Sequence, residues 1–323
     1  MHWKSPESDW ELRVTPAVGR FSCTRCGKCC NRPPEVELSE AAALADSFVF
    51  RLMFRLYWFP RGLADYLELN RASENAAALF YQKKRLLSAF AAREYPAQLS
   101  RRGRAVEHKK YLMISALALD TRHRACSALN GSSCGIYERR PLACRSVPFH
   151  YSRADASAES DLKAFVQTPG YACDTSEEAG LVLDKGRLVD PETRRVRAEA
   201  MALAQLDRGW SKAIARRMDG GGPEDPLVPS LEEIELNSAF GATTISMRAA
   251  WQIALQMGLM HDQEFNELIE AQLTTIDREL AAGNCSQEAR ETLVEMRAEY
   301  EQSLANRAGA GRSAPVLGTT SGT

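Results

Sequence analysis

The sequence contains no long uncharged hydrophobic run. The longest apolar stretch, residues 48–59, contains Arg51 and Arg55 and is shorter than the about 18 residues that indicate a membrane-spanning helix. The first ten residues carry charges of both signs and have no apolar centre, which is not typical of a secretory signal. We therefore expect no membrane partner and a cytoplasmic, reducing location, where disulfide bonds are rare.

Several signatures of common enzyme classes are also missing. The sequence has no glycine-rich dinucleotide fingerprint, no phosphate-binding loop and no nucleophile elbow, so no bound nucleotide or flavin is expected. The cluster motif of radical adenosylmethionine enzymes has three residues between its first two cysteines, whereas only two separate Cys23 from Cys26. No alternating strand–helix barrel pattern accompanies the cysteines.

The net charge of -1 conceals an uneven distribution of charge along the chain. Residues 1–153 contain 25 Lys and Arg against 14 Asp and Glu, whereas residues 154–323 contain 16 against 28. Eight of the nine cysteines lie in the basic half or shortly after it, at or before Cys173. An excess of positive charge is typical of a nucleic-acid surface, but it can also compensate a buried negative centre. The cysteines favour the second interpretation.

Four cysteines lie within eight positions of the basic half: Cys23, Cys26, Cys29 and Cys30. Thiols separated by two residues can bind one metal because a tight turn brings their side chains together, and Gly27 favours such a turn. A lone reduced cysteine usually acts as a small hydrophobic residue in a core. Four cysteines so close together, flanked by basic residues, indicate metal binding instead.

Four more cysteines follow at a distance, at Cys126, Cys134, Cys144 and Cys173. The first two flank an Asn-Gly turn at residues 130–131, so a hairpin could present both at one end. Cys144 follows Pro141, where the start of a helix offers N–H groups that favour a thiolate. Cys173 lies in a predicted loop.

Eight thiols can form two four-thiolate sites or one site with spare ligands, and the sequence leaves the pairing open. Cys29 and Cys30 are adjacent and are expected to point in different directions. One of them would then serve a second site or stay unligated.

The identity of the metal depends on the spacing of the ligands. Thiolate ligands suit both zinc and iron–sulfur clusters. The C-x-x-C-x-x-C spacing of Cys23, Cys26 and Cys29 is the one by which bacterial ferredoxin loops hold three irons of a 4Fe-4S cluster, with a remote fourth ligand. We therefore prefer an iron–sulfur cluster and keep zinc as the alternative.

Two motifs together resemble a known family. The segment CTRCGKCC at residues 23–30, followed by CGIYERRPLACRSVPF at residues 134–149, resembles the bacterial cysteine-cluster family CxxCxxCC, whose members are described as zinc- or iron-chelating proteins. The resemblance extends over about residues 21–173 and implies metal binding; members often carry the label iron–sulfur oxidoreductase. Cys126 and Cys173 resemble the family's other two cysteine positions more loosely. The match is weakest at Cys173, because residues 169–173 read PGYAC where the family typically has Cys-Pro-Gly.

The pattern of apolar residues predicts an α+β fold. We expect a small cysteine-rich metal-binding domain with short strands and helical insertions over residues 1–189, a mostly helical C-terminal region over residues 190–307 and a disordered tail over residues 308–323. Ser39 would begin a helix through Phe48, Leu52 and Leu56. Ser73 would begin another that carries Phe90 and stops before Pro96. Residues 109–119 are typical of a strand, and short hairpins are expected around residues 130–131 and 184–186.

Helices are expected in four parts of the C-terminal region. Their predicted ranges are residues 190–218, 244–257, 262–282 and 286–306, with a capping box at Ser230 and Glu233. The sequence GGGP at residues 220–223 is the best candidate for an internal linker. Cys285, far from the other cysteines, is expected to be a structural thiol.

Other polar residues receive simpler interpretations. His123 and His150 lie near the cysteine segments but are expected to be surface or hydrogen-bonded histidines. Three arginines of the second motif are expected to donate hydrogen bonds to cluster sulfurs or backbone carbonyls: Arg139, Arg140 and Arg145. The basic residues at 101–110 are expected to form a solvated loop, and no nucleic-acid partner is expected.

The sequence thus predicts an iron–sulfur protein with an electron-transfer or other redox role and an unidentified redox or protein partner. One alternative is a zinc protein whose thiolates hold loops together, leaving function to the helical region. A further alternative is an iron–sulfur enzyme that modifies a peptide or protein held by the charged, helical C-terminal half.

Overall fold

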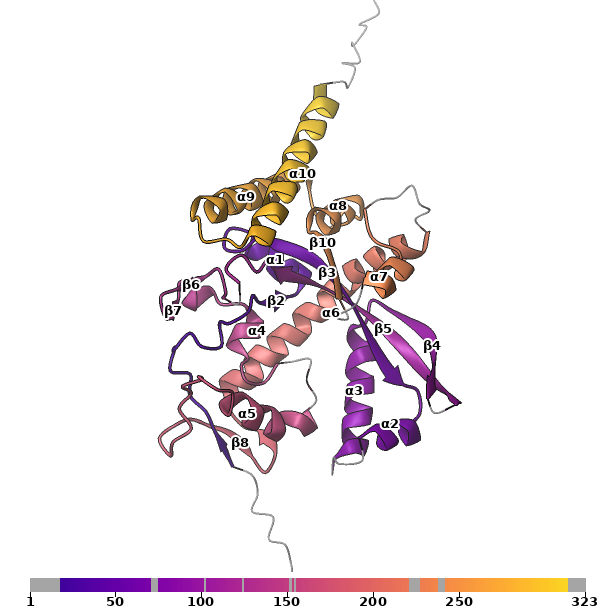
Figure 1. The fold of residues 1–323 in the computed structure, drawn as a ribbon, viewed down its shortest axis with the longest axis vertical. Helices are drawn as coiled ribbons and strands as arrows, with labels where there is room; N and C mark the ends of the chain where they lie inside the picture. Colours follow the sequence, from indigo (N-terminus) through magenta and orange to yellow (C-terminus); the bar gives the residue numbers. More distant parts are fainter. Residues whose placement is uncertain are drawn as a thin grey trace, which may run out of the picture.

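The computed structural model describes residues 18–70, 75–101, 103–123, 125–150, 153, 155–220, 227–237 and 242–312. The last long helices gather at one end of the molecule, while the short elements that carry the remote cysteines lie along one side (Figure 1). The predicted cap at Ser73, the linker at residues 221–223, Arg102 and the tail from residue 313 lie outside the described residues.

The centre of the fold is an antiparallel sheet built on two long strands. β3 (Phe50–Pro60) pairs along its whole length with β5 (Arg104–Ala118). Three further strands complete the sheet: β2 (Glu35–Val36) and β4 (Arg93–Arg101) pair with β5, and β10 (Ala242–Ser246) pairs with β3. The strand predicted at residues 109–119 is confirmed.

β3 corrects the helix that was expected to continue through residues 48–59. Helix α1 ends at Ala43 (Leu38–Ala43), and the aromatic segment is a strand at the centre of the sheet. Phe48, Leu52 and Leu56 have the i, i+4 spacing of a helix face, but Phe50 and Phe54 fill the positions between them. Side chains two residues apart share one face of a strand, so the four that lie in β3 form one buried stripe, and Phe48, just before the strand, is buried as well.

Two further predictions fail in the same sheet. Residues 242–246 form β10, so the helix expected at residues 244–257 is reduced to α8 (Arg248–Gln256). Of the basic residues at 101–110, the four that the structure describes lie on paired strands and not in a loop: Arg101, Arg104, Lys109 and Lys110. Lys109 and Lys110 form ion pairs with Glu94 and Glu235 at 2.5 Å.

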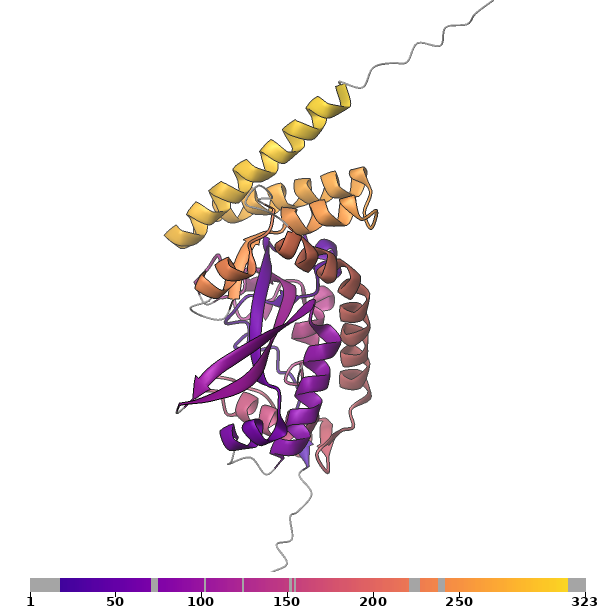
Figure 2. The ribbon, with the colours of Figure 1, turned by 90° about the vertical axis from the view of Figure 1, so that its right-hand side faces the viewer.

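Helices cover the sheet, and most of the predicted ones are present. α3 (Ala76–Phe90) and α6 (Pro191–Gly220) lie side by side next to the sheet, to the right of the strands in Figure 2, and both contact β5. α2 (Leu63–Leu69) packs against α3. α7 (Leu231–Asn237) begins with the expected capping box, in which Ser230 N–H donates to Glu233 Oε2 at 2.7 Å and Glu233 N–H to Ser230 Oγ at 3.2 Å.

The last two helices form an antiparallel pair. α9 (Asp262–Ala281) confirms the predicted helix at 262–282, and α10 (Gln287–Arg312) confirms the one at 286–306 and extends it into the predicted tail. The main hydrophobic core joins the sheet to these helices, since Phe50 and Phe54 share one buried cluster with Trp251, Phe265 and other C-terminal residues.

Short elements carry the cysteine segments. β1 (Gly19–Arg20), β8 (Leu181–Asp184) and β9 (Arg187–Leu188) form a small sheet, and β6 (Leu129–Asn130) and β7 (Ser133–Cys134) form the predicted hairpin. The 3-10 helix η1 (Tyr137–Arg139) precedes α4 (Leu142–Arg145), and η2 (Asp155–Ser157) leads into α5 (Ala158–Val166). The structure is therefore α+β, as predicted. In the part of the chain that the structure describes, no helix has the length and apolarity needed to cross a bilayer.

Candidate metal centre

A short antiparallel ladder brings the first cysteine segment against the last one. Ser22 N–H donates to the Asp174 carbonyl at 2.9 Å, and Asp174 N–H donates to the Ser22 carbonyl at 3.1 Å. In an antiparallel pair the next residues along the two chains face each other, so Cys23 and Cys173 are neighbours. The Thr24 hydroxyl, which donates to the Ala172 carbonyl at 2.8 Å, holds the segments together one step further on.

The turn that follows points backbone N–H groups at Cys26. The N–H of Lys28, and more weakly that of Ala172, hydrogen-bonds the sulfur and lowers the pKa of Cys26. Gly27 has φ +70° and packs so tightly that a Cβ on it would lie 2.4 Å from the Ser132 carbonyl oxygen. The role predicted for Gly27 in the turn is confirmed, and the first cysteine loop lies directly against the β6–β7 turn.

The β6–β7 hairpin positions a second group of thiols. Cys126 N–H donates to the Cys30 carbonyl at 2.9 Å, and Leu129 N–H donates to the Cys126 carbonyl at 3.0 Å. Leu129 is also the direct strand partner of Cys134. The hairpin therefore brings Cys126 and Cys134 toward Cys30, and Cys126 is only 7% exposed.

Cys144 lies on α4, but the helix start does not favour its thiolate as expected. A side-chain oxygen of Glu40 accepts the N–H of Leu142 at 2.6 Å, so this N–H at the start of the helix is already used. Burial, together with the nearby thiols of Cys126 and Cys29, raises the pKa of Cys144 to about 12.

Cys29 and Cys30 are adjacent in the chain, and their thiols interact. The interaction between the two thiols lowers the pKa of Cys29 to about 6 and raises that of Cys30. Arg140 also lowers the pKa of Cys29 through its positive charge. Cys29 is close enough to both Cys144 and Cys173 to affect their pKa values, so the pair lies where the two groups of thiols meet.

Two arginines enclose an aromatic ring next to these thiols. The guanidinium carbon of Arg25 lies 4.0 Å from the centre of the Tyr137 ring, and that of Arg140 lies 3.8 Å from it. Arg140 Nε also donates to the Tyr137 carbonyl at 3.1 Å, which is the backbone contact predicted for it. The stacking holds positive charge beside Cys29.

The other two arginines of the second motif interact with carboxylates. Arg139 forms an ion pair with Asp46 at 3.1 Å and donates to a backbone carbonyl, that of Ala43, at 3.4 Å. Arg145 lies 3.7 Å from Glu192 and 3.8 Å from Glu199 on α6. Both therefore tie the cysteine segment to neighbouring helices.

The histidines agree with the simpler interpretation. His123 is exposed and has φ +48°. His150 is partly buried, and burial followed by the charges of Arg153 and Arg197 lowers its pKa to about 4. His150 is therefore neutral at pH 7.

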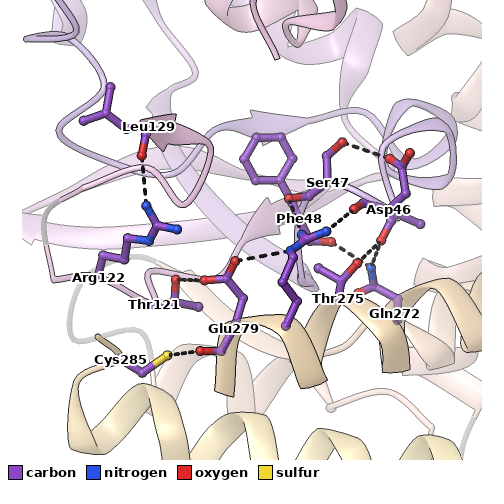
Figure 3. Close-up of polar contacts among 12 residues, drawn as sticks. Asp46, Ser47, Phe48, Thr121, Arg122, Leu129, Gln272, Thr275, Glu279 and Cys285 are labelled. Atoms are coloured by element: carbon purple, nitrogen blue, oxygen red, sulfur yellow. Dashed lines mark hydrogen bonds and ion pairs between the residues drawn. The ribbon is translucent and has the colours of Figure 1, made fainter. Parts of the chain in front are cut away.

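α9 contributes polar residues that the sequence analysis did not identify, and one of them contacts the segment that precedes Cys126. Glu279 accepts a hydrogen bond from the Thr121 hydroxyl at 2.8 Å, and Arg122 donates to the Leu129 carbonyl in β6 at 2.9 Å (Figure 3). Cys285 donates to the Glu279 carbonyl at 3.2 Å and thus has the structural role expected of it. The sequence did contain a pattern that could have indicated these buried contacts, namely polar residues on the otherwise apolar face of the helix: Gln272, Thr275 and Glu279.

The donor set fits a soft metal, although the thiols have not converged on one point. All nine cysteines are free, and eight of them lie in the adjoining segments described above. Within the described ranges, no three Cys, His, Asp or Glu side chains already have an arrangement that could hold an ion. Thiol donors and N–H···S hydrogen bonds suit either zinc or iron.

Comparison with known proteins supports this chemistry. Residues 22–174 match the family model CxxCxxCC, described as "Putative zinc- or iron-chelating domain". Neither the curated proteins nor the solved structures contain a match to the chain. The matched segment begins next to Cys23 and ends just after Cys173, so it includes all eight clustered thiols. Residues 22–174 of this chain therefore belong to the CxxCxxCC family of zinc- or iron-chelating cysteine domains.

Proposed function

We propose that the cysteine domain holds an iron–sulfur cluster and serves in electron transfer. The observation that carries the proposal is the loop of Cys23, Cys26 and Cys29, which combines ferredoxin-like spacing with backbone N–H groups directed at the sulfur of Cys26. When bound, such a cluster accepts and donates single electrons.

The residues around the loop favour a negatively charged thiolate centre. Hydrogen bonds from backbone N–H groups stabilise the thiolate of Cys26, and Arg140 stabilises that of Cys29. Hydrogen bonds to sulfur and nearby positive charge also raise the reduction potential of a cluster. Cys23 is exposed, so a partner can approach the centre closely.

The proposal includes a redox protein as partner and the cytoplasm as the location. A reducing environment keeps the thiols available for metal, consistent with nine free cysteines. Positive side chains at the mouth of the loop, Arg25 and Lys28, are exposed to solvent and suit an acidic partner surface.

A structural zinc site is the second candidate, favoured by the hairpin. A tight turn between paired strands brings Cys126 and Cys134 together, which is a common arrangement of zinc ligands. In that case the helical region would provide the functional surface.

Anaerobic purification with metal and sulfide analysis tests the proposal. We expect iron and acid-labile sulfide together, with visible absorption that bleaches on reduction by dithionite. Cys26→Ser should weaken this absorption, while Cys285→Ser, the control outside the cysteine domain, should keep it in full. Zinc bound stoichiometrically, without iron or sulfide, would overturn the iron–sulfur proposal and support the structural zinc site.

A further inference from the structure

The thiols divide into two groups with different backbone connections. The outer group is held by the ladder between residues 22 and 174, which places Cys23 beside Cys173. Cys26 joins this group because the Ala172 N–H hydrogen-bonds its sulfur, and Cys173 lies within electrostatic range of both Cys23 and Cys26. The outer group therefore contains Cys23, Cys26 and Cys173.

The inner group is organised by the β6–β7 hairpin and α4. The backbone hydrogen bond from Cys126 to Cys30 fixes these two residues side by side, and the hairpin register brings Cys134 close to Cys126. Cys144 lies within electrostatic range of Cys126 and Cys134, and Cys30 within range of Cys126 and Cys144. The inner group therefore has four thiols without Cys29.

Cys29 is close to thiols of both groups, and the number of ligands decides its assignment. Zinc in structural sites and common iron–sulfur clusters each take four protein ligands. The inner group is already complete, whereas the outer group has three thiols and lies within reach of Cys29. Assigned in this way, the adjacent residues Cys29 and Cys30 serve different centres.

We infer that the domain binds metal at two separate four-thiolate centres. The outer centre consists of Cys23, Cys26, Cys29 and Cys173. The inner centre consists of Cys30, Cys126, Cys134 and Cys144. This inference rests on the proposed function only in requiring metal at these thiols, and it holds for iron or zinc.

The two centres differ in their access to solvent. The outer centre includes the exposed Cys23, whereas the inner centre includes Cys126, which is 7% exposed. Metal at the outer centre should therefore exchange faster with chelators, and the inner centre should act mainly to hold the hairpin, α4 and the first loop together.

Single serine variants of the full chain, purified anaerobically, test the division. The readouts are metal per chain and alkylation of each cysteine followed by mass spectrometry. Cys29→Ser should lose about half of the bound metal and expose the other three outer thiols, while the inner thiols stay protected. Cys30→Ser should give the reverse pattern, and Cys285→Ser should keep all the metal.

Cys173→Ser is a second variant of the outer centre, included in case Cys29→Ser does not fold. It lies in a loop, and it should reproduce the Cys29→Ser pattern with an unchanged circular dichroism spectrum. Exposure of all remaining clustered thiols in both Cys29→Ser and Cys173→Ser, or metal equivalent to one centre in the parent protein, would overturn the division. Two centres filled with zinc would support the division into two centres and overturn the iron–sulfur proposal. A single iron–sulfur centre would support the iron–sulfur proposal and overturn the division.

Discussion

The hydroxyl group of Thr121 donates a 2.8 Å hydrogen bond to the carboxylate of Glu279, joining the segment before Cys126 to the C-terminal end of α9 (Figure 3). Both side chains are buried, Thr121 at 1% and Glu279 at 4% exposure. Ser286 N–H donates to the Thr121 carbonyl at 3.2 Å, so the residue just before α10 also contacts Thr121. The cysteine domain and the last two helices therefore depend on one another for stability.

Removing this hydroxyl should destabilise the protein. Thr121→Val leaves the Glu279 carboxylate buried without its hydroxyl donor, which should cost about 1–3 kcal/mol of unfolding free energy. Urea unfolding measures the change. Thr274→Val on the exposed face of α9 is the matched control and should change stability by less than about 0.5 kcal/mol. Equal effects of the two substitutions would show that the buried contact contributes nothing.

Gln272 makes a second buried contact between α9 and the start of β3. Its amide oxygen accepts the Phe50 N–H at 2.9 Å, and its amide nitrogen donates to the carbonyls of Ala45 and Phe48 at 2.8 and 2.7 Å. Gln272→Ala leaves the Phe50 N–H and the Phe48 carbonyl unsatisfied, while the Thr275 hydroxyl still donates to the Ala45 carbonyl at 3.0 Å. The substitution should cost about 2 kcal/mol or more in urea unfolding. Gln263→Ala, an exposed glutamine of the same helix, should be close to neutral.

The sequence predicted the helices that have clear caps and one apolar face, but it predicted β3 wrongly. Any strand whose alternate residues are apolar also contains the i, i+4 pairs of a helix, as Phe48 and Leu52 do. The aromatic residues Phe50 and Phe54 between them were the evidence for a strand. β10 was missed although Thr243, Thr244 and Ile245 are β-branched, because its partner strand lies about 190 residues earlier in the sequence.

The cysteine motifs were sufficient to predict metal chemistry, but not the grouping of the thiols. That grouping depends on the contact of Ser22 with Asp174 and on that of Cys30 with Cys126, which join residues about 150 and 96 positions apart. Neither contact leaves a local pattern in the sequence. The hydrogen bond between Thr121 and Glu279 could not be predicted from the sequence either, because Thr121 lies in a loop and Glu279 on a helix far along the chain.

Gly27 provides a test of the contact between the first cysteine loop and the hairpin. An alanine there would have φ +70° and a Cβ 2.4 Å from the Ser132 carbonyl oxygen, so backbone strain and steric overlap act together. Gly27→Ala should cost more than about 2 kcal/mol and weaken metal retention during dialysis against a chelator. Both effects follow because the loop can no longer lie against β6–β7.

Gly103→Ala is the control that separates the effect of backbone strain from that of steric overlap at Cβ. Gly103 also has a positive φ, +77°, but a Cβ there would meet nothing within 4 Å. This variant should lose only about 1 kcal/mol in urea unfolding and keep its metal. Similar metal loss in the two variants would contradict the proposed role of the close contact at Gly27.

Glu37 should make stability fall as the pH rises. It is partly buried beside other carboxylates; burial, followed by the charges of Asp207, Glu40 and Glu35, raises the pKa of Glu37 to about 8. The unfolded chain releases this proton at the usual pKa of a glutamate, while the folded protein keeps it until near pH 8. Between these values the unfolded state binds fewer protons, so each unit of pH lowers the free energy of unfolding.

Replacing Glu37 by glutamine removes this proton without changing the size of the side chain. Glu37→Gln should gain stability relative to the parent protein as the pH is raised from about 5 to about 9, with an upper limit of several kcal/mol because one pKa unit corresponds to about 1.4 kcal/mol. Urea unfolding of both proteins across this range, under identical metal loading, measures the difference. Glu288→Gln, at an exposed position of α10, should show no such trend. A difference between Glu37→Gln and the parent that stays constant with pH would mean that the Glu37 carboxyl ionises equally easily in the folded and unfolded protein.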